Sequence, residues 1–196
     1  LIEVNDINPI FNSLKIKNAP TLVRLNIKDI NLAPKLFDLG IDGLIIANTN
    51  NENDLKKVIS FSMYPPKGNR SIGFAKSNNF NFKQSDLKFS PILIPMIEKK
   101  EAVENLNDFK KHKEFDGFFI GPVDLSASYK KFKSGKTFLI EKIINKIHKE
   151  MKISKIPIGM HSISFQKNEL KKFINKKYNF VAYSADSVIL RNYYKF

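Results

Sequence analysis

The chain has 196 residues, 42% hydrophobic and 27% charged, which is enough for a single domain with a substantial core. No apolar run approaches the ~20 residues of a membrane-spanning helix, which argues against a membrane protein. There is no cysteine, so disulfides and thiolate metal sites are excluded and a cytoplasmic location is expected. The formal net charge is +14, but it comes from 30 lysines and three arginines spread along the chain. Nucleic acid is therefore a disfavoured partner, because its recognition usually uses clustered arginines and aromatics.

Strands and helices are predicted to alternate along the chain. Short apolar runs bounded by glycine or proline indicate buried strands, and amphipathic stretches indicate helices. The predicted strands are 1–4, 21–25, 43–47, 91–97, 117–120, 157–161 and 180–184. The predicted helices are 29–39, 51–63, 101–111, 137–151, 166–176 and 190–196. Between them, segment 64–88 has no clear period, and long irregular segments of compact domains are often functional.

This alternation predicts parallel strands with helical crossovers, in a barrel or a doubly wound sheet. No Gly-x-Gly-x-x-Gly pattern follows a strand, which disfavours a doubly wound dinucleotide fold. The chain begins without methionine and inside a predicted strand. Seven repeats therefore predict one α/β domain over residues 1–196, a (β/α)8 TIM barrel that is N-terminally incomplete and lacks its first β/α unit.

Two consecutive predicted strands each deliver one carboxylate. Glu98 ends the run 91–97, and Asp124 follows the Gly121-Pro122 break, so we expect it in a loop just past strand 117–120. The C-terminal edge of parallel strands is where such folds bind ligands. Carboxylates suit Mg²⁺ or Mn²⁺ and would leave coordination positions for water and substrate. The spacing leaves a second interpretation open, in which Glu98 caps the next helix and Asp124 turns a loop.

The arginines stand out because lysine is the default cation of this chain. A retained arginine indicates a need for the planar guanidinium, although chance retention at the surface is the alternative. The three are Arg24, Arg70 and Arg191. Arg24 and Arg70 would place positive charge near an anionic substrate or a developing enolate.

The sequence resembles the HpcH/HpaI aldolase/citrate lyase family of metal-dependent class II pyruvate aldolases. A YPPxGxR pattern at residues 64–70 and a GPxDLSxS pattern at residues 121–128 carry the resemblance, with Ile97-Glu98 between them. It extends from about Thr21 to the C-terminus. It implies a barrel that makes or breaks a carbon–carbon bond beside pyruvate, in a 2-keto-3-deoxy or other 4-hydroxy-2-oxo acid.

The resemblance also implies roles for individual residues. Glu98 and Asp124 would hold a divalent cation, Mg²⁺ or Mn²⁺ with Co²⁺ as an alternative, which chelates pyruvate and stabilises its enolate. Arg24 would stabilise the same oxygen, and Asp38 would work with a histidine in proton transfer. The substrate-binding residues would be Arg70, Gly121, Pro122, Val123 and Ser126. The resemblance further implies a homo-oligomer with a small keto acid as its partner.

The sequence departs from the family where a histidine is expected. The family carries an Asp-x-Glu-His motif, but residues 3–6 contain no histidine, which leaves Asp6 as the candidate substitute. A degenerate, non-catalytic barrel that binds a keto acid or a partner protein is therefore the alternative. His112 and His148 lie on lysine-rich predicted helices and are expected to be solvated. His161 ends a strand, where it is either structural or near the site.

Overall fold

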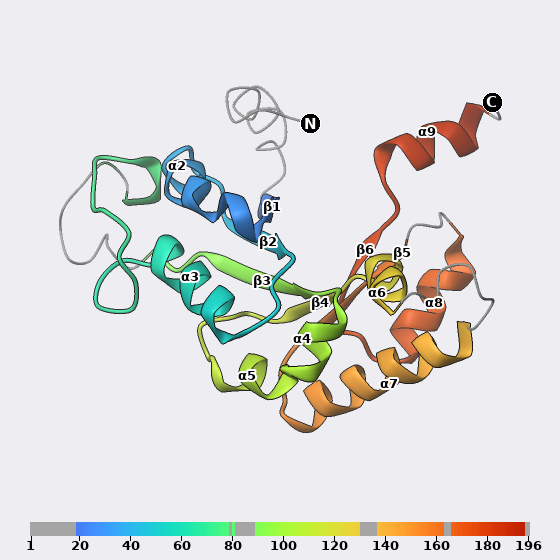
Figure 1. Ribbon diagram of the computed structural model, residues 1–196. Helices are drawn as coiled ribbons and strands as arrows, with labels where there is room; N and C mark the ends of the chain where they lie inside the picture. Colours follow the sequence, from blue (N-terminus) through green and yellow to red (C-terminus); the bar gives the residue numbers. More distant parts are fainter. Residues whose placement is uncertain (1–18, 79, 81–88, 130–136, 163–165, 195–196) are drawn as a thin grey trace. The chain divides into compact units, whose positions relative to one another are not determined.

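The computed structural model describes residues 19–78, 80, 89–129, 137–162 and 166–194 (Figure 1). It consists of two compact units, residues 1–95 and 96–196, and strand β3 continues from the first into the second. The predicted strand 1–4 and the candidate residue Asp6 lie outside the described residues. Within those residues, no helix is both long enough and apolar enough to cross a membrane.

The first unit is built on parallel strands that pair in the order of the sequence. β1 (Leu22–Asn26) pairs with β2 (Gly43–Ala47), and β2 pairs with the first four residues of β3 (Ile92–Ile97). Among its described residues, the helical segments are η3 (Ile27–Leu32), α2 (Ala33–Asp38), α3 (Glu52–Ser62) and η4 (Lys76–Asn78). Phe37, Leu44 and Leu55 are fully buried in its core.

The second unit repeats the same pattern. The last two residues of β3 pair with β4 (Phe118–Ile120), and β5 (Ile158–Ser162) and β6 (Phe180–Tyr183) follow, all parallel. Its helices are α4 (Lys100–Glu104), α5 (Leu106–Lys111), α6 (Pro122–Ser128), α7 (Thr137–Ile153), α8 (Lys167–Asn175) and α9 (Asp186–Tyr194). α7 packs on α6 and β5, and α8 packs on β5 and β6. The α/β class with parallel strands is thus confirmed for both units.

Three predicted helices differ from the observed ones. Where helix 190–196 was predicted, α9 begins four residues earlier, at Asp186. The predicted helix 29–39 is a 3₁₀ segment followed by α2, which starts beside Pro34 because proline lacks the N–H that later helical positions must donate. The predicted helix 101–111 divides into α4 and α5 at Asn105, whose backbone leaves the helical region (φ −94°, ψ 19°). The apolar pattern continues through Asn105, so periodicity alone did not reveal the break.

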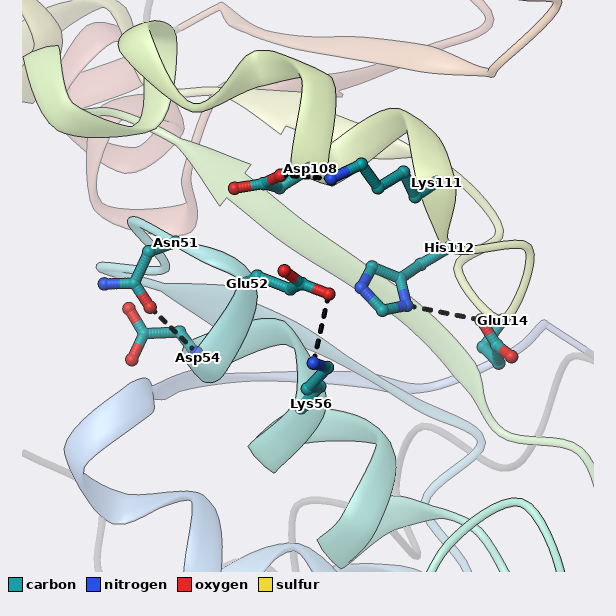
Figure 2. A network of polar contacts seen from close by, with 8 residues as sticks. All are labelled: Asn51, Glu52, Asp54, Lys56, Asp108, Lys111, His112 and Glu114. Atoms are coloured by element: carbon teal, nitrogen blue, oxygen red, sulfur yellow. Dashed lines mark hydrogen bonds and ion pairs between the residues drawn. The ribbon is translucent and has the colours of Figure 1, made fainter.

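Local polar contacts lie along α3 and along α5 (Figure 2). Asn51 caps α3, because its Oδ1 accepts a hydrogen bond from the Asp54 N–H at 3.1 Å. Glu52 and Lys56 form an ion pair one turn apart at 3.1 Å, and Asp108 and Lys111 form another at 2.8 Å. Such exposed pairs contribute at most about 1 kcal/mol each, so burial of the apolar core dominates the stability of both units.

Candidate active site

Glu98 directly follows β3 and is almost fully buried, with 1% of its surface exposed. It lies against the turn that opens α6. A Cβ atom added to Gly121 would stand 2.9 Å from Glu98 Cβ and 3.0 Å from Glu98 Oε2. The Gly121 N–H also donates to the Ile97 carbonyl at 3.2 Å. The structure therefore brings Glu98 and Gly121 together, and the close approach requires that residue 121 has no side chain.

Asp124 lies in the first turn of α6, so the expectation of a loop was wrong. The helix starts directly after Gly121, and its first turn closes with the Leu125 N–H donating to the Gly121 carbonyl at 3.0 Å. The Gly-Pro pair that suggests a loop in the sequence is a helix start, because proline is well suited to the first helical position. Asp124 is exposed. An acidic side chain in a first turn is favoured by the helix dipole.

The second unit thus holds a buried carboxylate and an exposed one, on segments that follow neighbouring strands. Among the described residues, no group of three or more His, Cys, Asp or Glu side chains is arranged to hold a metal ion. A cation held by Glu98 and Asp124 would keep coordination positions for water and substrate. The carboxylate oxygens of these two residues suit a hard divalent ion. A bound cation would also offset the free-energy cost of burying the Glu98 carboxylate.

The remaining predicted residues of this unit lie on α6 or directly before it. Gly121 is buried, whereas Val123 is 44% exposed. Pro122 and Ser126 are partly exposed. The assignment of these four residues to substrate binding stays a prediction.

Arg70 occupies an aromatic cage in the first unit. Its side chain is fully buried, and its Nη2 donates to Asp38 Oδ1 at 2.6 Å and to Ser77 Oγ at 2.7 Å. Its guanidinium carbon lies 4.7 Å from the ring centroid of Tyr64, 5.1 Å from that of Phe37 and 5.3 Å from that of Phe89. Contacts of this kind favour a cation over aromatic faces.

The cage gives Arg70 and Asp38 a clear local role. Arg70 joins the YPPxGxR segment to the end of α2, where Asp38 is the last residue and its side chain is 51% exposed. The sequence singled out Arg70 by the scarcity of arginine but did not reveal its aromatic neighbours. The assignments of Arg70 to substrate binding and of Asp38 to proton transfer stay predictions.

Arg24 lies in the middle of β1, opposite Ile45 of β2, and is exposed. The candidate residues are thus divided between the units. Arg24, Asp38 and Arg70 belong to the first, and the structure brings Asp38 and Arg70 into contact. The second holds Glu98, Gly121, Pro122, Val123, Asp124 and Ser126.

His112 and His148, which were expected to be solvated, are only partly exposed. The His112 side chain is 15% exposed, and its Nδ1 lies 3.7 Å from Glu114 Oε2. Figure 2 shows the two side chains facing each other. The His148 ring lies 4.4 Å from the ring of Tyr178. Burial lowers the pKa of His148 below 6.5; the Lys177 backbone raises it, while Lys152 and Lys176 lower it further. Burial raises the pKa of Tyr178 to about 12, because it disfavours the charged phenolate. The lysine-rich sequence around these histidines did not reveal their partial burial.

His161 stands in β5, with its ring 6.2 Å from that of Phe119. Its side chain is partly exposed. This contact supports a packing role at the end of the strand. Sequence analysis left that role open beside a position near the site.

A family model described as HpcH/HpaI aldolase/citrate lyase matches residues 4–192. The chain belongs to this family. The hydroxypyruvate/pyruvate aldolase of Roseobacter denitrificans is 26% identical over 132 residues, which cover 64% of this chain and 51% of the relative. A 2-keto-3-deoxy-L-rhamnonate aldolase of Escherichia coli is 31% identical over 106 residues, which cover 50% of this chain and 39% of the relative. The matches to these curated relatives thus span about half of their length or less.

Solved structures share the fold of this family member. The HpcH/HpaI aldolase of Desulfitobacterium hafniense DCB-2 aligns with a TM-score of 0.85 at 17% identity, covering 100% of this chain and 77% of that one. The protein CitE of Mycobacterium tuberculosis, in complex with magnesium and acetoacetate, aligns with a TM-score of 0.60 at 10% identity, covering 96% and 74%. The TM-scores show that the fold is shared, and at identities this low the likeness shows the fold alone.

Proposed function

We propose that this chain is a metal-dependent aldolase that cleaves a 2-keto-3-deoxy acid or other 4-hydroxy-2-oxo acid to pyruvate and an aldehyde. The observation that carries the proposal is the buried Glu98 carboxylate held against Gly121, beside the helix that bears Asp124, in a member of this family. Its parallel strands would belong to a (β/α)8 barrel. The absence of cysteine supports a cytoplasmic location, and the family resemblance supports a homo-oligomer.

Glu98 and Asp124 would hold the divalent cation, Mg²⁺ or Mn²⁺, with Co²⁺ as an alternative. The cation, when bound, supplies Lewis-acid polarisation of a keto group. Gly121 leaves the Glu98 carboxylate its space, and the backbone of Gly121, Pro122 and Val123 would bind the substrate carboxylate. Ser126, on the same helix, would complete that contact.

The family resemblance assigns the remaining chemistry to the first unit. Arg24, exposed on β1, would stabilise negative charge that develops on the substrate. Asp38 would support proton transfer through water. Arg70 occupies one acceptor position of its carboxylate, and the half-exposed group has further positions for water. Asp6 would substitute for the histidine that residues 3–6 lack.

A second candidate function is the binding of a keto acid without turnover. Two observations favour it: residues 3–6 contain no histidine, and Asp38 is engaged by the buried Arg70. In this case the metal and the keto acid would still bind at Glu98 and Asp124.

Pyruvate release from 4-hydroxy-2-oxo acids, measured with lactate dehydrogenase and NADH, tests the proposal. We expect activity that EDTA abolishes and Mn²⁺ restores, and that Asp124→Asn lowers by at least about 100-fold. Activity that persists in EDTA would contradict the metal-dependent mechanism. Pyruvate binding without turnover, measured by calorimetry in the presence of Mn²⁺, would favour the second function.

A further inference from the structure

Ser128 ends α6 and closes the GPxDLSxS pattern, yet sequence analysis gave it no role. Its Oγ accepts a hydrogen bond from the Lys100 N–H at 3.0 Å and donates one to the Leu125 carbonyl at 2.7 Å. Lys100 is the second residue after Glu98, and Leu125 directly follows Asp124. One hydroxyl therefore joins the two backbone segments that carry the candidate metal ligands.

The Lys100 N–H needs this acceptor because it is the first N–H of a helix. The opening N–H groups of a helix have no partner within it, and a side chain at the N-cap commonly accepts from one of them. The N-cap of α4 is Lys99, which makes no side-chain cap, since an ammonium group has no acceptor. Ser128 takes part of this role from another helix, 28 residues away in sequence.

A second connection lies at the other end of α6. There the Gly121 N–H donates to the Ile97 carbonyl at 3.2 Å, and Gly121 packs against Glu98. The seven residues of α6 are thus tied to the Glu98 segment both before and after Asp124. Two attachment points restrict both the rotation of a helix and its sliding along its axis, whereas one would leave rotation free.

We propose that Ser128 is a positioning residue whose hydroxyl fixes Asp124 relative to Glu98 and thereby sets the affinity for the divalent cation. The inference rests on the proposed function through one assumption, that these two carboxylates bind the cation. Groups that orient metal ligands typically change the affinity by about 10- to 100-fold when they are lost.

Mn²⁺ titration calorimetry without substrate tests the proposal, together with thermal unfolding. We expect Ser128→Ala to weaken Mn²⁺ binding about tenfold and Ser128→Thr, which keeps the hydroxyl, to preserve it. Ser128→Cys keeps the volume with a weak acceptor and should lose affinity as alanine does, which covers the case in which the alanine variant does not fold. The matched control is Asn179→Ala, because Asn179 Oδ1 accepts from the Ile158 N–H at 3.0 Å where β5 begins, at the opposite end of the strands.

Asn179→Ala should lower the melting temperature about as much as Ser128→Ala but leave the Mn²⁺ affinity unchanged. Wild-type affinity in both the alanine and cysteine variants would overturn the positioning role. Equal loss of affinity in Ser128→Ala and Asn179→Ala would also overturn it, because the loss would then reflect general destabilisation. A wild-type chain that binds no Mn²⁺ would instead overturn the proposed metal centre itself, and this inference with it.

Discussion

The two units bury opposite charges in different ways. In the first unit, Arg70 is enclosed by protein groups: Asp38, Ser77 and three aromatic rings. In the second, Glu98 lies against a glycine that presents no side chain, one strand away from the exposed Asp124. A buried charge whose partners are protein groups is costly to leave unpaired, whereas two carboxylates of unequal burial suit a cation that arrives from solution. We therefore propose that the Arg70 cage is mainly structural and that the Glu98 site binds a ligand.

The largest expected effect separates the two roles through metal-linked stability. Saturating Mn²⁺ should stabilise the wild-type chain by about 2.7 kcal/mol at 100 times the dissociation constant, because it binds only the folded state. Glu98→Gln should lose most of this stabilisation, and Asp38→Asn should keep it. Thermal unfolding with and without Mn²⁺ measures both. A Glu98→Gln chain that Mn²⁺ still stabilises fully would remove the distinction between the units.

The Arg70 cage predicts an asymmetry between its two charged members. Asp38→Ala leaves a buried guanidinium without its carboxylate and should destabilise the chain by about 2–3 kcal/mol, below the range for fully buried pairs because Asp38 is half exposed. Arg70→Met leaves only a half-exposed carboxylate that water can solvate, and it should cost less. Urea unfolding measures both variants. A larger loss for Arg70→Met would show that the contacts with the rings outweigh the ion pair.

Gly121→Ala tests whether the second site depends on the missing side chain. The added Cβ would stand about 3 Å from the Glu98 side chain, so the carboxylate has to shift and Mn²⁺ affinity should fall about tenfold. Gly73→Ala is the control, because a Cβ there meets no atom within 4 Å among the described residues. Calorimetry should show wild-type affinity for the control. Unchanged Mn²⁺ affinity in Gly121→Ala would mean that the Glu98 side chain can shift without affecting metal binding.

The smallest effect concerns His148, a partly buried titratable ring outside both sites. Its pKa is lowered in the folded chain by burial, so below about pH 6.5 the unfolded chain binds more protons than the folded one. The free energy of unfolding should therefore reach its highest value above pH 6.5, as far as His148 is concerned, and decrease as the pH falls through that value. Denaturant midpoints between pH 7.5 and about 5.5 measure this, and His148→Gln should flatten the curve. An unchanged slope in this variant would contradict the assignment.

Local signals predicted much of the fold. The strand 43–47 was predicted to the residue, because Gly43 marks its start and its side chains are apolar on both faces. The break at Asn105 and the helix start at Pro122 were missed, since an apolar pattern continues through the first and Gly-Pro is typical of loops as well as of helix starts.

The candidate site was predictable only in part. Strand ends identified Glu98 and Asp124, because the chain direction fixes which edge of a parallel sheet they occupy. The Arg70 cage and the Ser128 bridge depend on residues far apart in sequence, such as Phe37 with Phe89 and Lys100 with Ser128. Pairings over such separations are decided by tertiary packing.

Calorimetric titration of Mn²⁺ into the wild-type chain, Glu98→Gln and Asp124→Asn measures whether the two carboxylates bind one cation. We expect one ion per wild-type chain and a loss of at least about 100-fold in affinity for each variant, because each removes a charged ligand from the same ion. Wild-type affinity in either variant would show that the two carboxylates do not form one site.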